Sequence, residues 1–269
     1  MQATPLVSII VPCYNHGKFI EAALASAAAL TYPNTEVIII DDGSTDPFTI
    51  EMLKKLESSY TVIRQANQGP SVARNNAVKH SKGEFVLALD SDNKVRPEYL
   101  SIAIPLFLKN PKLGVVYSDF QYFGDSNEVK RLFDFDISRM LVYNYIDMCS
   151  VMRRTAFDEL GGFDEYMSKR GLEDWDFWIG MYEKGWELLH LNQVMFDYYV
   201  TDASRTVQVA NKNVDDLRRY VYAKHAGLLV KEYQELYYRH KQLAETPDYR
   251  IGNKLMAPYR AIKKLLKGK

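Results

Sequence analysis

The chain has 269 residues, of which 47% are hydrophobic and 25% charged, so it can bury a large core and is not extensively disordered. Its 34 basic and 34 acidic residues cancel, which excludes the global positive field expected of a nucleic-acid-binding protein. Two cysteines, Cys13 and Cys149, cannot build a disulfide framework and suit a reducing compartment.

Apolar runs alternate with helical patterns over the first 95 residues. The runs predict buried strands at 6–11, 35–40, 61–63 and 85–89. The segments between them predict helices at 18–30, 47–57 and 71–79. Three successive strand–helix units favour an α/β fold with a parallel, doubly wound sheet. In such sheets ligands bind beyond the carboxyl ends of the strands.

The run at 85–89 ends in two carboxylates, Asp90 and Asp92. Alternate residues of an extended segment point the same way, so both can converge on one divalent cation that a diphosphate shares. Two solvated turn acids before Asn93 are the alternative interpretation.

Polar residues also follow the other strands, with Tyr14 after the first, Asp42 after the second and residues 67–69 after the third. An aromatic ring such as that of Tyr14 can stack on a planar base, and Asp42 can accept the imide N–H of uracil. A loop-packing tyrosine and a helix-capping aspartate are the alternatives. The glycine patterns of dinucleotide-binding folds and of P-loops are absent, so those functions lack a phosphate cradle.

Five stretches carry a family resemblance: SIIVPCYNHGKFIEAALAS, EVIIIDDGSTD, NQGPSVARNNAVKHSKGEFVLALDSDN, CSVMRRTAFDELGGF and GLEDWDF. In this order, over roughly residues 6–205, they resemble family 2 glycosyltransferases with the GT-A fold. That fold has a Rossmann-like, mostly parallel central sheet flanked by helices. The resemblance implies a sugar-nucleotide donor and a divalent metal, Mn²⁺ or Mg²⁺. The residues implied in donor binding are Pro12, Tyr14, Asn15, Asp41, Asp42, Arg74, Asp90 and Ser91, and the metal would be held by Asp92 with Asp90.

The resemblance also implies that Asp174, of the pair Glu173-Asp174, is the catalytic base. One in-line displacement with one base inverts the anomeric configuration, and a carboxylate must take the proton of the acceptor hydroxyl. Neighbouring helical residues diverge by about 100°, so at most one or two acids of this cluster can face the cleft. We expect Asp174 to do so, with Glu173 next in line. A row of acids that the helix dipole favours is the structural alternative.

The chain is expected to divide into three parts: a nucleotide-binding half at about 1–95, an acceptor half at about 96–205 and a helical C-terminal extension at 206–269. Residues 186–200 predict two short strands, and residues 211–244 predict a long helical stretch. The aromatic and acidic segment 117–147 matches no acceptor motif.

The C-terminal tail, residues 250–269, holds seven cations and no acid. Pro258 is expected to open a helix there, with Tyr259 and Ile262 on its apolar face. Such a basic amphipathic helix can lie on an anionic membrane surface, and a solvated helix packed on its own domain is the alternative. No signal peptide and no apolar run of ~18–20 residues is visible. We therefore expect a cytoplasmic protein, or one that is peripheral at the inner face of the cell membrane.

These features favour an inverting, metal-dependent hexosyl- or N-acetylhexosaminyltransferase. It would move a sugar from a UDP-sugar to a hydroxyl of a glycan or lipid-linked acceptor in surface polysaccharide synthesis. The Q-x-x-R-W element of processive synthases is absent, which favours single transfer. A non-catalytic nucleotide-sugar or glycan-binding module needs no base, and a nucleotidyltransferase would need a basic loop after the first strand.

Overall fold

The computed structural model describes the backbone of residues 4–201 and 214–267, and the side chains of these segments up to residue 259. Within them the chain forms one nine-stranded sheet in the order β3-β2-β1-β4-β8-β6-β9-β5, with β7 paired to β6. The chain divides into two units, Met1–Val221 and Tyr222–Lys269. The boundary expected near residue 205 falls in 202–213, outside the described residues.

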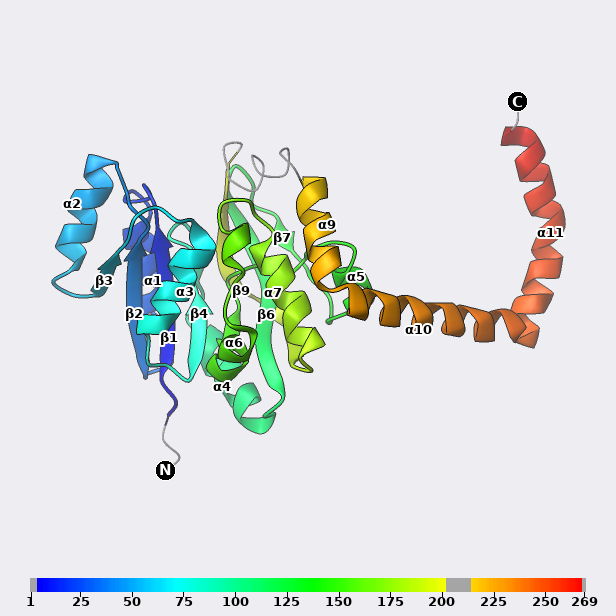
Figure 1. Ribbon diagram of the computed structural model, residues 1–269, viewed down its shortest axis with the longest axis horizontal. Helices are drawn as coiled ribbons and strands as arrows, with labels where there is room; N and C mark the ends of the chain where they lie inside the picture. Colours follow the sequence, from blue (N-terminus) through cyan, green and yellow to red (C-terminus); the bar gives the residue numbers. More distant parts are fainter. Residues whose placement is uncertain (1–3, 202–213, 268–269) are drawn as a thin grey trace. The chain divides into compact units, whose positions relative to one another are not determined.

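The first half of the sheet is parallel, as predicted (Figure 1). Its strands are β1 (Val7–Cys13), β2 (Thr35–Asp41), β3 (Thr61–Arg64) and β4 (Phe85–Ala88). The connecting helices are α1 (Ile20–Ala28), α2 (Pro47–Leu56) and α3 (Pro70–His80). The predicted α/β class is therefore confirmed.

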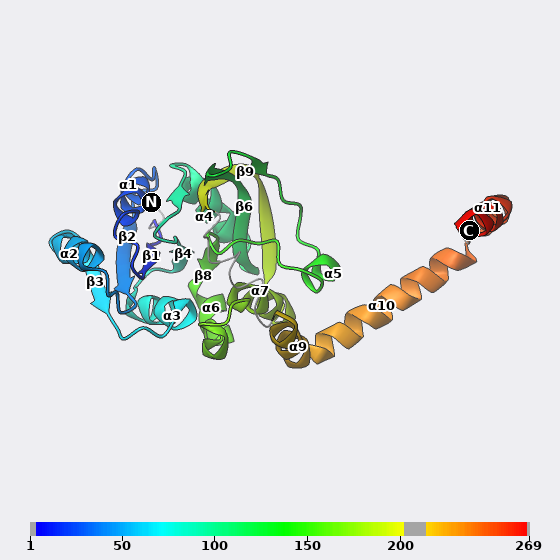
Figure 2. The same cartoon turned by 90° about the horizontal axis from the view of Figure 1, so that it is seen from above.

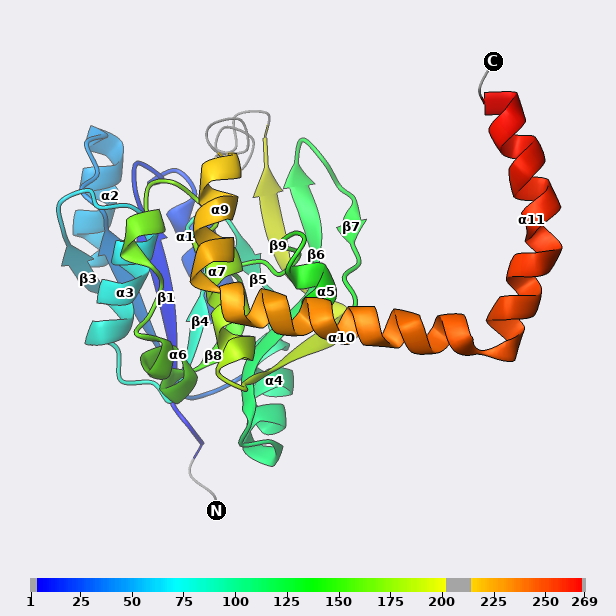
Figure 3. The ribbon, with the colours of Figure 1, turned by 45° about the vertical axis from the view of Figure 1, so that its right-hand side comes forward.

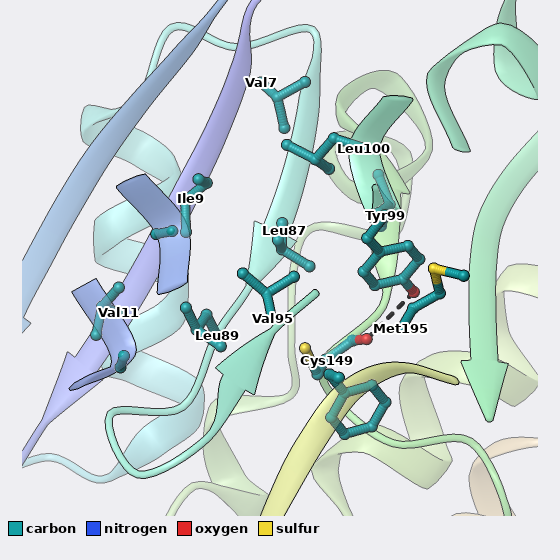
Figure 4. Packing of buried hydrophobic residues seen from close by; sticks show 14 of the residues in the cluster. Val7, Ile9, Val11, Leu87, Leu89, Val95, Tyr99, Leu100, Cys149 and Met195 are labelled. Atoms are coloured by element: carbon teal, nitrogen blue, oxygen red, sulfur yellow. Dashed lines mark hydrogen bonds between the residues drawn. The ribbon is translucent and has the colours of Figure 1, made fainter. Parts of the chain in front are cut away.

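Helices cover both faces of this sheet. Figure 2 shows α1 and α4 (Tyr99–Lys109) on one side and α3, α6 (Arg154–Leu160) and α7 (Glu173–Glu183) on the other. The alternate residues Val7, Ile9 and Val11 of β1 pack into the same buried cluster as α1 and α4 (Figure 4). In that cluster the Tyr99 hydroxyl donates to the carbonyl of Cys149 at 3.2 Å, so a buried polar group is satisfied.

The second half of the sheet is mixed. Here β8 (Val151–Arg153) runs antiparallel to both β4 and β6, and β9 runs parallel to β6 and antiparallel to β5. This half also contains β5 (Lys94–Val95), β6 (Leu113–Gly124), β7 (Val129–Lys130), α5 (Ile137–Met140) and the 3₁₀ helix η1 (Glu165–Met167).

The prediction of two short strands over 186–200 is wrong, because β9 is one strand, Glu187–Val200. Its register against β6 jumps from Leu191, opposite Ser118, to Val194, opposite Asp119. Asn192 and Gln193 therefore bulge from the ladder and are exposed. These two polar residues interrupt the apolar pattern, so the sequence resembles two short strands instead of one.

The C-terminal helices are α9 (Val214–Lys224), α10 (Ala226–Glu245) and α11 (Pro247–Lys267), and Figure 3 shows all of them. The expectation that Pro258 opens the last helix is wrong, because Pro258 lies inside α11. Pro247 occupies the first helical position instead, where a missing N–H costs nothing. No helix in the described ranges is long and apolar enough to cross a bilayer.

Candidate active site

The carboxyl ends of the parallel strands meet at one edge of the sheet. Cys13 pairs with Asp41 at the ends of β1 and β2, and the Asp42 N–H donates to the Cys13 carbonyl at 2.9 Å. The Leu89 N–H beyond β4 bonds to Ile10 in β1 at 3.0 Å. The predicted convergence of the strand-end residues is therefore present in the structure.

The residues after β4 form a turn, since the Asn93 N–H donates to the Asp90 carbonyl at 3.0 Å. The extended geometry used to predict convergence of the two carboxylates is thus wrong. Asp90 Oδ1 lies 2.7 Å from Arg74, whereas Asp92 Oδ2 lies 3.7 Å from the ring of His16. Ser91, between them, is buried with its hydroxyl 3.2 Å from the same ring.

Arg74 of α3 links the two halves of the domain. The residue is 6% exposed, and its guanidinium donates to Asp90 at 2.7 Å and to Glu173 at 3.2 Å. Burial lowers its pKa, but the two carboxylates outweigh burial and hold the pKa above its ordinary value. Among the described residues the buried Nε has no hydrogen-bond partner, because the two carboxylates bond to the terminal nitrogens.

Asp42 organises the loop after β3. Its carboxylate is 4% exposed and accepts hydrogen bonds from the side chain of Gln65 at 2.7 Å and from the N–H groups of Gln68 and Gly69 at 2.8 and 2.7 Å. Gly69 has φ +89°, and a Cβ there would lie 2.7 Å from the Ser168 carbonyl, so the turn requires glycine. The nucleobase-reading role of Asp42 stays a prediction.

The loop after β1 contains the other predicted donor-binding residues. Asn15 has φ 57°, and its Oδ1 accepts the N–H groups of residues 45 and 46, which ties this loop to the one after β2. Asp41 accepts the Ser44 N–H at 2.8 Å. Pro12 is partly buried, and Tyr14 is 45% exposed. The Tyr14 ring is thus free to stack on a base.

The start of α7 separates the two acids proposed for catalysis. Leu172 before it has φ 65°, a strained conformation for a side chain of this size. Glu173 faces Arg74, as given above, whereas Asp174 accepts from Asn144 Nδ2 at 2.8 Å and from the Trp175 N–H at 2.8 Å. Burial, with Glu173 adding to it, raises the pKa of Asp174 to about 7. That value suits a general base near neutral pH.

Two residues that act on Asp174 were not predicted from the sequence. Asn144 bonds to it directly, and burial raises the pKa of Asp147 to about 7, with Asp90 and Asp174 contributing. Both come from the irregular segment between α5 and β8, where no periodicity or motif marks them.

The residues present fit a divalent cation that the ligand shares. In the described ranges no group of three or more His, Cys, Asp or Glu could hold a metal by itself. Burial and the Asp90 carboxylate raise the pKa of Asp92 to about 6. A cation bound near Asp92 would therefore stabilise its ionised form. Mg²⁺ and similar ions bind through one or two carboxylates plus substrate phosphates. That both Asp90 and Asp92 hold the ion stays a prediction.

Comparison with known proteins agrees with this geometry. Chondroitin synthase of Escherichia coli is 26% identical over 241 residues, which are 87% of this chain and 34% of the relative. This chain thus spans about a third of that relative's length.

Two solved structures share the fold. S. aureus TarS in complex with UDP-GlcNAc matches with a TM-score of 0.62 at 23% identity, over 74% of this chain and 59% of TarS. Mannosyltransferase PcManGT from Pyrobaculum calidifontis, in complex with GDP-Man and Mn²⁺, matches with a TM-score of 0.59 at 18% identity, over 100% and 89%. At these identities the likeness establishes the GT-A fold. Residues 8–161 match the sequence model of glycosyl transferase family 2, and the chain belongs to that family.

Proposed function

We propose that the protein is an inverting glycosyltransferase that moves a hexosyl or N-acetylhexosaminyl group from a nucleoside-diphosphate sugar to a hydroxyl. The observation that carries this proposal is the pair of contacts at Arg74, which joins Asp90 at the donor edge to Glu173 beside Asp174. A carboxylate with a pKa of about 7 is thereby held next to a phosphate-binding edge. A binding module needs no such base.

The reaction follows from these groups. Asp174 takes the proton of the acceptor hydroxyl as its oxygen bonds to the anomeric carbon, and the bond from that carbon to the diphosphate oxygen breaks in line. The nucleoside diphosphate leaves with the bonding electron pair. The positive charge of Arg74 favours the negative charge that develops there. A divalent ion held by Asp92 would neutralise part of this charge when bound.

UDP is the proposed nucleotide. The TarS structure contains UDP-GlcNAc, which supports a uridine donor, whereas PcManGT contains GDP-Man. Asp42 and Tyr14 are the proposed base-reading residues. The similarity to chondroitin synthase supports a glycan acceptor in polysaccharide synthesis.

A panel of sugar nucleotides tested for thermal stabilisation, with Mn²⁺ and with EDTA, would identify the donor. Asp92→Ala should abolish the stabilisation that depends on Mn²⁺. Equal stabilisation of the parent protein in Mn²⁺ and EDTA would contradict the metal assignment.

Asp174→Asn tests the base directly, because removal of a general base costs ~10²–10⁴ in rate. Turnover should fall by that factor while donor affinity is nearly unchanged. Glu173→Gln and Asp147→Asn, which remove the two neighbouring acids, are measured in the same way for comparison with Asp174→Asn. If Asp174→Asn keeps the parent's turnover, the base is a different residue.

The C-terminal tail is proposed to contact an anionic membrane surface, which would bring the enzyme to a lipid-linked acceptor. On α11 the side chains of Ile251, Leu255 and Tyr259 are 57%, 75% and 57% exposed, and residues 249–269 carry cations without acids. Side chains from residue 260 onward lie outside the described ones. The full chain should co-sediment with anionic liposomes and dissociate in high salt, since each surface cation contributes about 1 kcal/mol. Equal sedimentation after truncation at Tyr249 would exclude the tail.

A further inference from the structure

Residues 140–146, here called the strap, are fixed to α7 by two buried indoles. Trp175 Nε1 donates to the Met140 carbonyl at 2.5 Å, and Trp178 Nε1 donates to the Ile146 carbonyl at 3.1 Å. Both indoles are at most 1% exposed. The strap is therefore held at both ends by the helix whose first turn contains Asp174.

Asn144 lies between these two attachment points. Its Nδ2 donates to Asp174 Oδ2 at 2.8 Å, and its Oδ1 accepts the Ile146 N–H at 3.1 Å. A backbone N–H can bond only to the oxygen of the amide, so the second contact fixes which end of the side chain faces Asp174. The strap thus presents a donor, and not an acceptor, to the carboxylate.

The contacts of Asp174 leave room for a substrate. Oδ1 accepts the Trp175 N–H and Oδ2 accepts Asn144, whereas two carboxylate oxygens offer about four lone-pair positions. Each oxygen can therefore still accept an acceptor hydroxyl. Because the two donors bond to different oxygens, turning the carboxylate about the Cβ–Cγ bond weakens both contacts, so the two bonds together fix its orientation.

We propose that Asn144 is a positioning residue for Asp174, which orients the carboxylate toward the acceptor hydroxyl and stabilises its ionised form. This inference rests on the proposed function, in which Asp174 is the base. The charged groups that act on Asp174 are Glu173 on α7, Arg74 on α3 and Asp147 beyond the strap. The two acids favour the protonated form, so a neutral donor opposes them without adding charge.

Asn144→Asp is the sharpest variant, because aspartate has the same shape and keeps an oxygen for the Ile146 N–H but loses the donor. Asn144→Ala loses both contacts. Val142→Ala is the matched control, since Val142 is on the same strap and is 62% exposed. Release of nucleoside diphosphate from the donor found in the screen is followed from pH 5 to pH 9, with water as acceptor where no sugar acceptor is in hand.

The acidic limb of the kcat profile should move up by about one pH unit in Asn144→Ala and further in Asn144→Asp, where a second acid faces Asp174. Since the parent pKa is about 7, this corresponds to a loss of roughly fivefold in kcat at pH 7 for Asn144→Ala, with the donor KM unchanged. Val142→Ala should keep the parent's profile. A merely structural role of Asn144 would lower activity at all pH values without moving the limb.

A second measurement does not depend on turnover. The infrared carbonyl band of protonated Asp174, assigned with Asp174→Asn, should persist to higher pH in both Asn144 variants than in the parent. Unmoved infrared and kinetic titrations would overturn the inference. If instead Asp174→Asn remains fully active, the base assignment fails, which is a separate result from the loss of the Asn144 effect.

Discussion

The acids at the two sides of the site differ in how the fold holds them. Asp42, at the end of a parallel strand, has three hydrogen-bond donors within 2.8 Å. Asp147, in the irregular chain between α5 and β8, accepts the Cys149 N–H at 2.8 Å, and its pKa is raised to about 7. Asp42 is thus fully hydrogen-bonded to its own loop, whereas Asp147 and Asp174 on the acceptor side have pKa values raised to about 7 and can take a proton.

This difference follows from topology. Loops at the carboxyl ends of parallel strands have unpaired backbone N–H groups, and side chains such as that of Asp42 can accept hydrogen bonds from several of them. The acceptor side is assembled from a helix start and the strap, which meet across long sequence separations. Arg74 joins the two sides, because it bonds to Asp90 and to Glu173.

Arg74→Ala should have the largest effect on stability. It leaves Asp90 and Glu173 without their buried partner, and breaking a buried ion pair by removing one member costs about 3–5 kcal/mol. Urea unfolding measures this loss in the free energy of unfolding.

Arg64→Ala is the matched control, since Arg64 is half exposed beside Glu57 and Asp41. Its loss should stay within about 1 kcal/mol, as for other surface ion pairs. Similar losses in the two variants would contradict the view that Arg74 joins the two sides.

The donor side could be predicted from sequence because its residues lie at strand ends. Apolar runs fix the strands, parallel pairing brings their ends together, and Tyr14, Asp42 and Asp90 follow directly. The sequence offers the turn at 90–93 only as the alternative interpretation, because the apolar run favours an extended continuation, and a hydrogen bond from Asn93 to Asp90 overrides it.

The acceptor side could be predicted only where a motif marks it. Glu173 and Asp174 were found by resemblance, but Asn144 and Asp147 lie in chain without helical or strand period. Their positions depend on indole bonds from Trp175 and Trp178 to strap carbonyls, and no local pattern encodes such long-range contacts.

Asp147→Asn should stabilise the protein at alkaline pH. The folded-state pKa is raised to about 7 from an unfolded value of about 3.9, so the folded protein binds this proton more tightly. The stability of the parent therefore falls as pH rises from about 4 through 7. Asparagine removes that dependence, which predicts a gain of about 2–4 kcal/mol at pH 8 and none near pH 4. Unfolding curves at both pH values check this, and equal gains at both would show a cause other than ionisation.

Asp42→Asn should have a smaller effect on stability than Arg74→Ala and a selective effect on binding. The amide nitrogen cannot accept, so the N–H group of Gln68 or of Gly69 loses its partner, which costs about 1–3 kcal/mol. If Asp42 also reads the imide N–H of uracil, the preference for uridine over other nucleoside diphosphates should weaken in the same variant. Calorimetry with UDP and GDP measures that preference. Asp41→Asn is the control, because an amide oxygen can still accept the Ser44 N–H and the ion pair of Asp41 with the half-exposed Arg64 contributes little. A variant that is destabilised but discriminates as sharply as the parent would limit Asp42 to organising the loop and assign base recognition to another group.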